Sequence, residues 1–207
     1  MISKLKYLSI IILLNIVLAC NVLGNRQVKK NSDIEKFDLA EFESKSIGIP
    51  STRSLRMIKN DTIIEMSETG DVFIKDTYQL NSPFINSKSF YKDNLSLKAD
   101  WNRFYLVPYG ILKKYDKQGI LIEEKDLDAV EKRTFSIYQL IKKMNEDFNI
   151  DLTNTKRIGI STTYHAIYGY CYMINVFDYK APGLHRQMMI DAKIGKTHLD
   201  EIISFIK

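Results

Sequence analysis

The chain has 207 residues, of which 45% are hydrophobic and 27% charged, with a formal net charge of +5. This length suits one domain or two small ones. The charges are spread along the chain without a clustered basic stretch, which argues against nucleic acid as a partner.

The first predicted element is an export signal over residues 1–19. Lys4 and Lys6 precede an apolar stretch, residues 8–19, that is shorter than the roughly 20 residues of a membrane-spanning helix. A basic start and a short apolar core are typical of a cleaved signal peptide. Cys20 follows at once, and the chain then becomes polar. A plain signal peptide or a membrane anchor with a chance cysteine is the alternative.

The run Val17-Leu18-Ala19-Cys20 resembles the lipobox of bacterial lipoproteins. The resemblance implies cleavage before Cys20 and acylation of its thiol and new amine. Stable anchoring takes two or more acyl chains, and this modification supplies three. Asn21 after the cysteine implies, by resemblance to enteric lipoproteins, transfer to the outer membrane. No acidic run follows, which favours the periplasmic leaflet over the cell surface.

Residues 20–45 are predicted to form a polar tether between the lipid and a folded part. Their first half, which includes "RQVKKNSD", has no hydrophobic period. The stretch "DIEKFDLAEFESK" at residues 33–45 has a second interpretation, a short helix after a cap at Asn31-Ser32-Asp33.

Residues 46–132 are predicted to form β-hairpins. Asn60-Asp61 and Gly70-Asp71 separate short apolar runs and can take the positive φ of hairpin turns. Residues 90–98 and 113–122 are related units, each an aromatic strand end, a polar turn and alternating aliphatic residues. They resemble the MORN-repeat-like modules of bacterial "antitoxin component" proteins, and the resemblance implies a hairpin sheet.

Residues 133–207 are predicted to form a helix, three strands and a short final helix. Ser136 with Gln139 reads as a capping box, and an apolar stripe follows at helical spacing: Ile137, Leu140, Ile141, Met144 and Phe148. The stretch "MMIDAKIGK" at 188–196 resembles the end of PepSY-like domains. The predicted fold class is therefore α+β, an antiparallel hairpin sheet followed by a helix-covered antiparallel sheet in the order α-β-β-β-α.

No catalytic, metal or cofactor site is predicted. His165, His185 and His198 are too widely spaced for a compact metal motif, and no phosphate loop or nucleophile motif occurs. Cys171 lies in an apolar run and reads as a small buried residue, with a reactive thiol as the alternative.

A cluster of tyrosines is the predicted partner-binding site. Tyr168, Tyr170 and Tyr172 alternate along one strand and are expected to share a face. Tyrosine is enriched at interface hot spots, so an exposed face would bind a protein partner. The alternative is that the three rings lie in the core and only their hydroxyl groups reach its rim.

These features predict a non-enzymatic, lipid-anchored cell-envelope binding protein. A specific form is an immunity protein that neutralises a toxin, which the "antitoxin component" resemblance suggests. The PepSY-like end implies a second function, inhibition or regulation of an exported protease. A third is an enzyme whose site no motif reveals.

Overall fold

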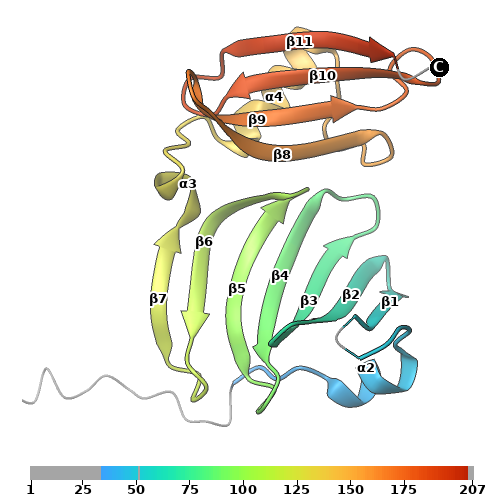
Figure 1. The fold of residues 1–207 in the computed structure, drawn as a ribbon, viewed down its shortest axis with the longest axis vertical. Helices are drawn as coiled ribbons and strands as arrows, with labels where there is room; N and C mark the ends of the chain where they lie inside the picture. The colour runs from blue at the N-terminus through green and yellow to red at the C-terminus, as the bar shows by residue number, and fades with distance from the viewer. Residues whose placement is uncertain (1–33, 51, 205–207) are drawn as a thin grey trace, which may run out of the picture. The chain divides into compact units, whose positions relative to one another are not determined.

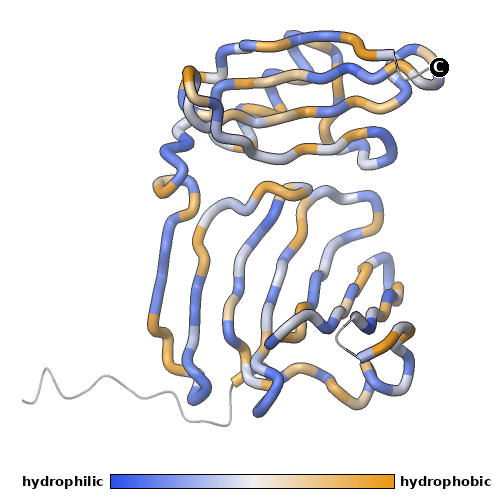
Figure 2. The backbone as a smooth tube through the Cα atoms, viewed as in Figure 1, coloured by the Kyte–Doolittle hydropathy of each residue, from blue (hydrophilic) through white to orange (hydrophobic). Residues whose placement is uncertain are grey.

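The computed structural model describes residues 34–50 and 52–204, and about half of them lie in two antiparallel sheets (Figure 1). The first sheet keeps chain order: β1 (Ser54–Lys59), β2 (Thr62–Thr69), β3 (Val72–Gln79), β4 (Phe84–Tyr91), β5 (Leu97–Phe104), β6 (Val107–Tyr115) and β7 (Leu121–Asp126). The second has the order β11-β10-β9-β8, with β8 (Ile158–His165), β9 (Gly169–Val176), β10 (Leu184–Asp191) and β11 (Thr197–Ser204). Apolar and polar residues alternate along several strands (Figure 2), as expected where one face of a sheet is buried.

The turns of the first sheet have the predicted chemistry. Asn60 and Asp61 take φ values of 49° and 62° and join β1 to β2 in a two-residue turn. Gly70, with φ 42°, helps to join β2 to β3. Positive φ in such turns matches the twist of the flanking strands. The hairpins predicted at both places are confirmed, and the related units at 90–98 and 113–122 contain the β4–β5 and β6–β7 turns.

Residues 34–45 pack against the first sheet, so the prediction of a tether is wrong for this part of the chain. The short helix α2 (Leu39–Lys45) begins after Asp38, whose carboxylate accepts a hydrogen bond from the Glu41 amide at 2.9 Å. Phe37 and Phe42 are buried against residues of four strands: Leu55, Met66, Phe73 and Phe90. Burial of these two phenylalanine rings removes a large apolar surface from water, which stabilises the packing of this segment against the sheet.

The helix α4 (Ile137–Phe148) packs on one face of the second sheet, as predicted. The Ser136 hydroxyl accepts from the Gln139 amide, and the Gln139 side chain accepts from the Ser136 amide at 2.7 Å, which completes the capping box. The helix buries three residues of its stripe, Ile137, Leu140 and Met144, in a core that includes β9 and β10. The other two stripe residues, Ile141 and Phe148, are partly buried against the same core, so the predicted stripe is confirmed.

The last element differs from the prediction. Residues 197–204 form the strand β11, paired with β10, and not a helix. β-branched Ile202, Ile203 and Thr197 suit a strand, and pairing satisfies the backbone groups along the edge of β10. The order within this region is therefore α-β-β-β-β, which corrects the final helix while the broader α+β class stands.

One of the two core clusters joins the two sheets. Phe104 and Val107, at the β5–β6 turn, belong to the same buried cluster as α4 and the second sheet. The Leu106 amide donates to the Ile160 carbonyl at 3.2 Å, and the Tyr105 hydroxyl donates to the Leu152 carbonyl at 2.9 Å. A short helix, α3 (Leu127–Val130), lies between β7 and α4 in the chain. The described residues accordingly belong to one compact unit.

Candidate functional site

The predicted tyrosine site falls on the hairpin formed by β8 and β9. Tyr164 on β8 lies directly opposite Tyr170 on β9, and their rings meet edge to face with centroids 5.3 Å apart. Cys20, the predicted lipidation residue, lies outside the described residues.

Tyr172 belongs to the core, which corrects its assignment to a partner-binding surface. Its side chain is fully buried, and its hydroxyl donates to the Phe135 carbonyl at 2.7 Å. Burial raises the pKa of this hydroxyl to about 12. Tyr172, Ile174 and Val176 share the buried cluster with α4, whereas Tyr170, two residues earlier, lies outside it and is exposed. The alternative of a core tyrosine therefore holds for Tyr172 alone.

Tyr168 does not follow the strand alternation, because it precedes β9 and Gly169 takes φ 75°. Its ring stacks between two imidazoles, with centroids 4.6 Å from His165 and 3.8 Å from His198. This stacking holds Tyr168 beside the hairpin turn while part of its surface remains in solvent.

The exposed aromatic and aliphatic residues at this end of the hairpin, which we call the hairpin patch, are Tyr164, Ile167, Tyr168 and Tyr170. Tyr164 and Tyr170 lie on one face of the sheet, whereas Tyr168 stacks on His165 and His198 at the other face. Tyr164 and Ile167 are the most open, with 67% and 78% of their surface exposed. Ile167 was not predicted as a site residue. Its position at the tip of an expected hairpin was the only sequence feature that pointed to this residue.

Asp191 organises the turn beside the patch. Its carboxylate accepts hydrogen bonds from the Lys193 amide at 2.7 Å and the Ile194 amide at 3.0 Å, and lies 3.2 Å from His198 Nε2. Burial alone would raise the pKa of Asp191, but these amides and the imidazole hold it below the ordinary value of 3.8.

Cys171 is the cross-strand neighbour of Asp191, yet it lacks the features of a nucleophile. The thiol is fully buried and lies 3.7 Å from the Gly169 carbonyl. Burial and the Asp191 charge both raise the pKa of this thiol, which disfavours the thiolate. The arrangement of Cys171, Asp191 and His198 therefore supports a structural turn better than covalent catalysis.

We expect Asp191→Asn to make the protein less stable at pH 7 and to matter less in acid. Because folding lowers the pKa of this carboxylate below 3.8, its stabilising contribution is complete above that value and is lost as the pH falls through the lowered pKa. Thermal melting of wild type and variant between pH 7 and pH 3 should show the difference in Tm shrink below about pH 3.8. Asp71→Asn, in an exposed turn, is the control. A difference that stays constant over this range would contradict the expectation.

No group of three or more histidine, cysteine, aspartate or glutamate side chains that could hold a metal ion occurs in residues 34–50 and 52–204. His185 lies apart from the other two histidines and meets Phe177 edge to face. Within the same described ranges, no helix is long and apolar enough to cross a membrane.

No family model, curated protein or solved structure matches this chain.

Proposed function

We propose that this protein is a lipid-anchored envelope protein that binds a protein partner through the hairpin patch. The observation that carries the proposal is the pair of exposed tyrosines on one face, Tyr164 and Tyr170, together with exposed Ile167 at the hairpin turn. Tyrosine offers a rigid, amphipathic contact surface with little entropy to lose. The patch lies on a paired hairpin, and the stacking of Tyr168 limits its motion further.

The same surface suits protein recognition better than turnover of a small substrate. Its side chains stand on a turn and its flanking strands. The imidazoles beside it already have partners, since His165 accepts from the Ile167 amide at 3.2 Å and His198 lies 3.2 Å from the Asp191 carboxylate. A toxin neutralised at the periplasmic face of the outer membrane is the partner that the "antitoxin component" resemblance suggests. That analogy concerns the fold and carries less weight than the patch itself.

We expect the double change Tyr164→Ala and Tyr170→Ala to weaken partner binding while the protein stays folded. Partners captured from envelope and secreted fractions would be identified by mass spectrometry, and their Kd values measured with wild type and variant. Hot-spot tyrosines contribute about 2 kcal/mol each, or about thirtyfold in Kd per residue. Tyr138→Ala, which removes an exposed tyrosine from α4, is the matched control. Equal Kd values for wild type and the double variant would remove the hairpin patch as the binding site.

We expect Cys20→Ser to abolish lipidation. The proposal assigns membrane attachment to acyl chains on this residue, and a serine hydroxyl does not replace the thiol in that modification. Metabolic labelling with palmitate should mark the wild-type protein, whereas the variant should remain uncleaved or become soluble. Cys171→Ser is the matched control and should keep the label. Undiminished labelling of Cys20→Ser would show that the lipid is attached elsewhere.

A further inference from the structure

A row of uncharged polar side chains crosses the first sheet. Strand register places Thr77 opposite Asn86, Asn86 opposite Asn102, and Asn102 opposite Tyr109. Directly paired residues of antiparallel strands lie on the same face, so these four side chains line one face across β3, β4, β5 and β6. Thr62 and Gln79, paired with each other on β2 and β3, form a second row beside the first.

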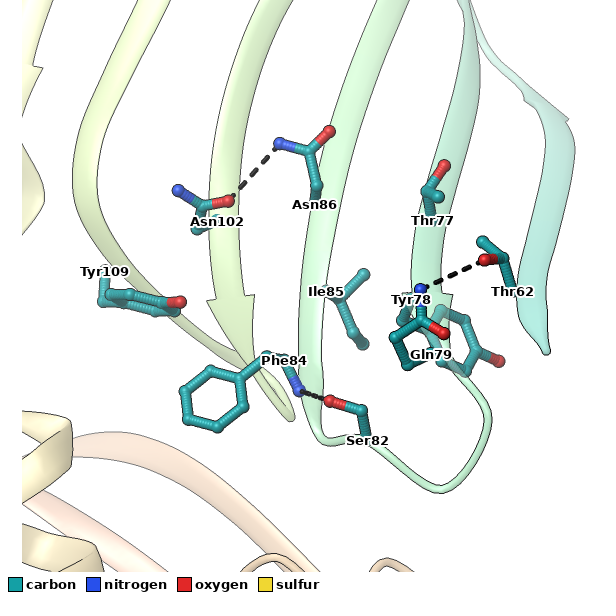
Figure 3. Close-up of a pocket in the computed structure, with 10 residues that line it drawn as sticks. All are labelled: Thr62, Thr77, Tyr78, Gln79, Ser82, Phe84, Ile85, Asn86, Asn102 and Tyr109. Carbon is teal, nitrogen blue, oxygen red and sulfur yellow. Dashed lines mark hydrogen bonds between the residues drawn. The ribbon is translucent and has the colours of Figure 1, made fainter. Parts of the chain in front are cut away.

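These rows line a hollow of about 320 Å³ (Figure 3). That volume falls within the range of small-ligand sites, about 300–1,000 Å³. None of the side chains around the hollow is charged at neutral pH, although 27% of the chain's residues are charged. The lining therefore favours a neutral ligand over an ion.

Hydrogen bonds between the side chains orient the amides of the hollow. Asn86 Nδ2 donates to Asp100 Oδ1 at 2.9 Å and to Asn102 Oδ1 at 3.3 Å (Figure 3 draws the second). An asparagine amide has two N–H donors and one oxygen with two lone pairs. These bonds leave the Asn86 oxygen to accept from a ligand and the Asn102 nitrogen to donate to one. On the neighbouring strands, Gln79 Nε2 donates to Thr62 Oγ1 at 3.1 Å, which leaves the Gln79 oxygen as a further acceptor.

Aromatic rings flank one side of the polar rows. Tyr109 and Phe84 meet edge to face with centroids 6.3 Å apart, and Phe84 stacks on Tyr138 of α4. The face of an aromatic ring carries a partial negative charge and attracts weakly positive C–H groups. A ligand with C–H groups on one side and hydroxyl groups around its rim could contact both kinds of lining.

Two lysines on this face of the sheet, Lys75 and Lys88, lie close to a carboxylate, which reduces their attraction for an anion. Lys88 forms an ion pair with Glu35, and Lys75 lies 3.9 Å from the same carboxylate. The position of the hollow on β2 to β6 also disfavours an extended peptide that would add to the sheet. Both edges of each of these strands are already paired, so no free backbone edge is available.

We propose that this hollow binds a neutral saccharide. Sugar hydroxyl groups both donate and accept, which fits the alternating oxygen and nitrogen atoms of the asparagines and Gln79. This site is separate from the hairpin patch, and the proposal does not depend on a protein partner.

The test is saturation-transfer NMR with the full chain in a detergent that carries no sugar headgroup. The probes are neutral oligosaccharides built from glucose, galactose, mannose, xylose and N-acetylglucosamine. Two comparison ligands are measured beside them: an oligogalacturonate, which is anionic, and an unstructured neutral peptide. We expect at least one neutral oligosaccharide to bind. Its Kd should rise at least tenfold in Asn102→Ala and at least threefold in Thr77→Val, which keeps the side-chain shape and removes the hydroxyl.

Gln118→Ala, an exposed amide in the β6–β7 turn, is the matched control and should leave the Kd unchanged. A melting curve of each variant would establish that the variant is folded. If Asn102→Ala does not fold, Thr77→Val alone tests the site. The proposal is overturned if no neutral oligosaccharide binds at millimolar concentration, if only the anionic probe or the peptide binds, or if the folded variants bind as wild type does.

Discussion

Leu140→Ala is expected to lower the free energy of unfolding by about 2–5 kcal/mol. Leu140 is fully buried at the centre of α4 and shares a cluster with Ile174 and Met188 of the second sheet. Its removal loses apolar burial and leaves a cavity between helix and sheet. Small domains have only about 5–15 kcal/mol of stability, so the urea midpoint should fall clearly.

The same experiment examines whether the two sheets unfold together. The cluster around Leu140 also contains Phe104 and Val107 of the first sheet, so the loss should shift a single transition seen by both far-UV circular dichroism and Trp101 fluorescence. Lys142→Ala, whose side chain is largely in solvent, is the control on the same helix and should change stability by at most about 0.5 kcal/mol. Equal midpoints for Leu140→Ala and wild type would place α4 outside the core.

Features set by neighbouring residues could be read from the sequence. The capping box at Ser136 and Gln139 and the positive-φ turn at Asn60 and Asp61 each depend on interactions within a few positions. The helical stripe of α4 likewise identified the face that is buried. These local structures are retained in the folded protein because contacts with the rest of the molecule do not compete with them.

The final strand shows where local signals fail. Leu199, Ile202 and Ile203 have helical spacing, yet β10 offers an edge of unpaired backbone groups and residues 197–204 complete it. The sequence of residues 197–204 contains no information that β10 lies beside them. Similarly, Phe37 and Phe42 looked like part of a polar tether, because the sheet surface that buries them is built by residues 55–90.

The candidate sites were predictable only in part. Strand alternation placed Tyr170 and Tyr172 on one face, but their exposure differs because α4 reaches Tyr172 and not Tyr170. The row of Thr77, Asn86, Asn102 and Tyr109 depends on the register of four strands. A shift of one residue in any pairing would move one of these side chains to the opposite face, so sequence alone could not reveal the hollow.

Arg133→Met is expected to destabilise the protein by about 3–5 kcal/mol, because it leaves carboxylates near the core without their cation. The Arg133 side chain is fully buried and lies 3.0 Å from Asp128 and 3.2 Å from Glu131. It also donates to the Pro108 carbonyl of β6, so it joins the first sheet to the segment that leads into α4. Loss of this group should therefore affect the junction between the two sheets.

Replacing one of the two carboxylates as well should recover part of the lost stability. Within the described chain, Arg133 Nε and Nη1 and Glu131 Oε2 have no hydrogen-bond partner of good geometry, so the burial of these charges is incompletely compensated. Arg133→Met combined with Glu131→Gln should therefore be more stable than Arg133→Met alone. Arg56→Met, which breaks the exposed pair with Glu65, is the matched control and should cost at most about 1 kcal/mol. Urea denaturation of the four proteins measures each difference. The expectation fails if the free energy of unfolding of Arg133→Met lies within about 1 kcal/mol of the wild-type value. The buried ion pairs would then contribute no more to stability than the exposed pair of the control.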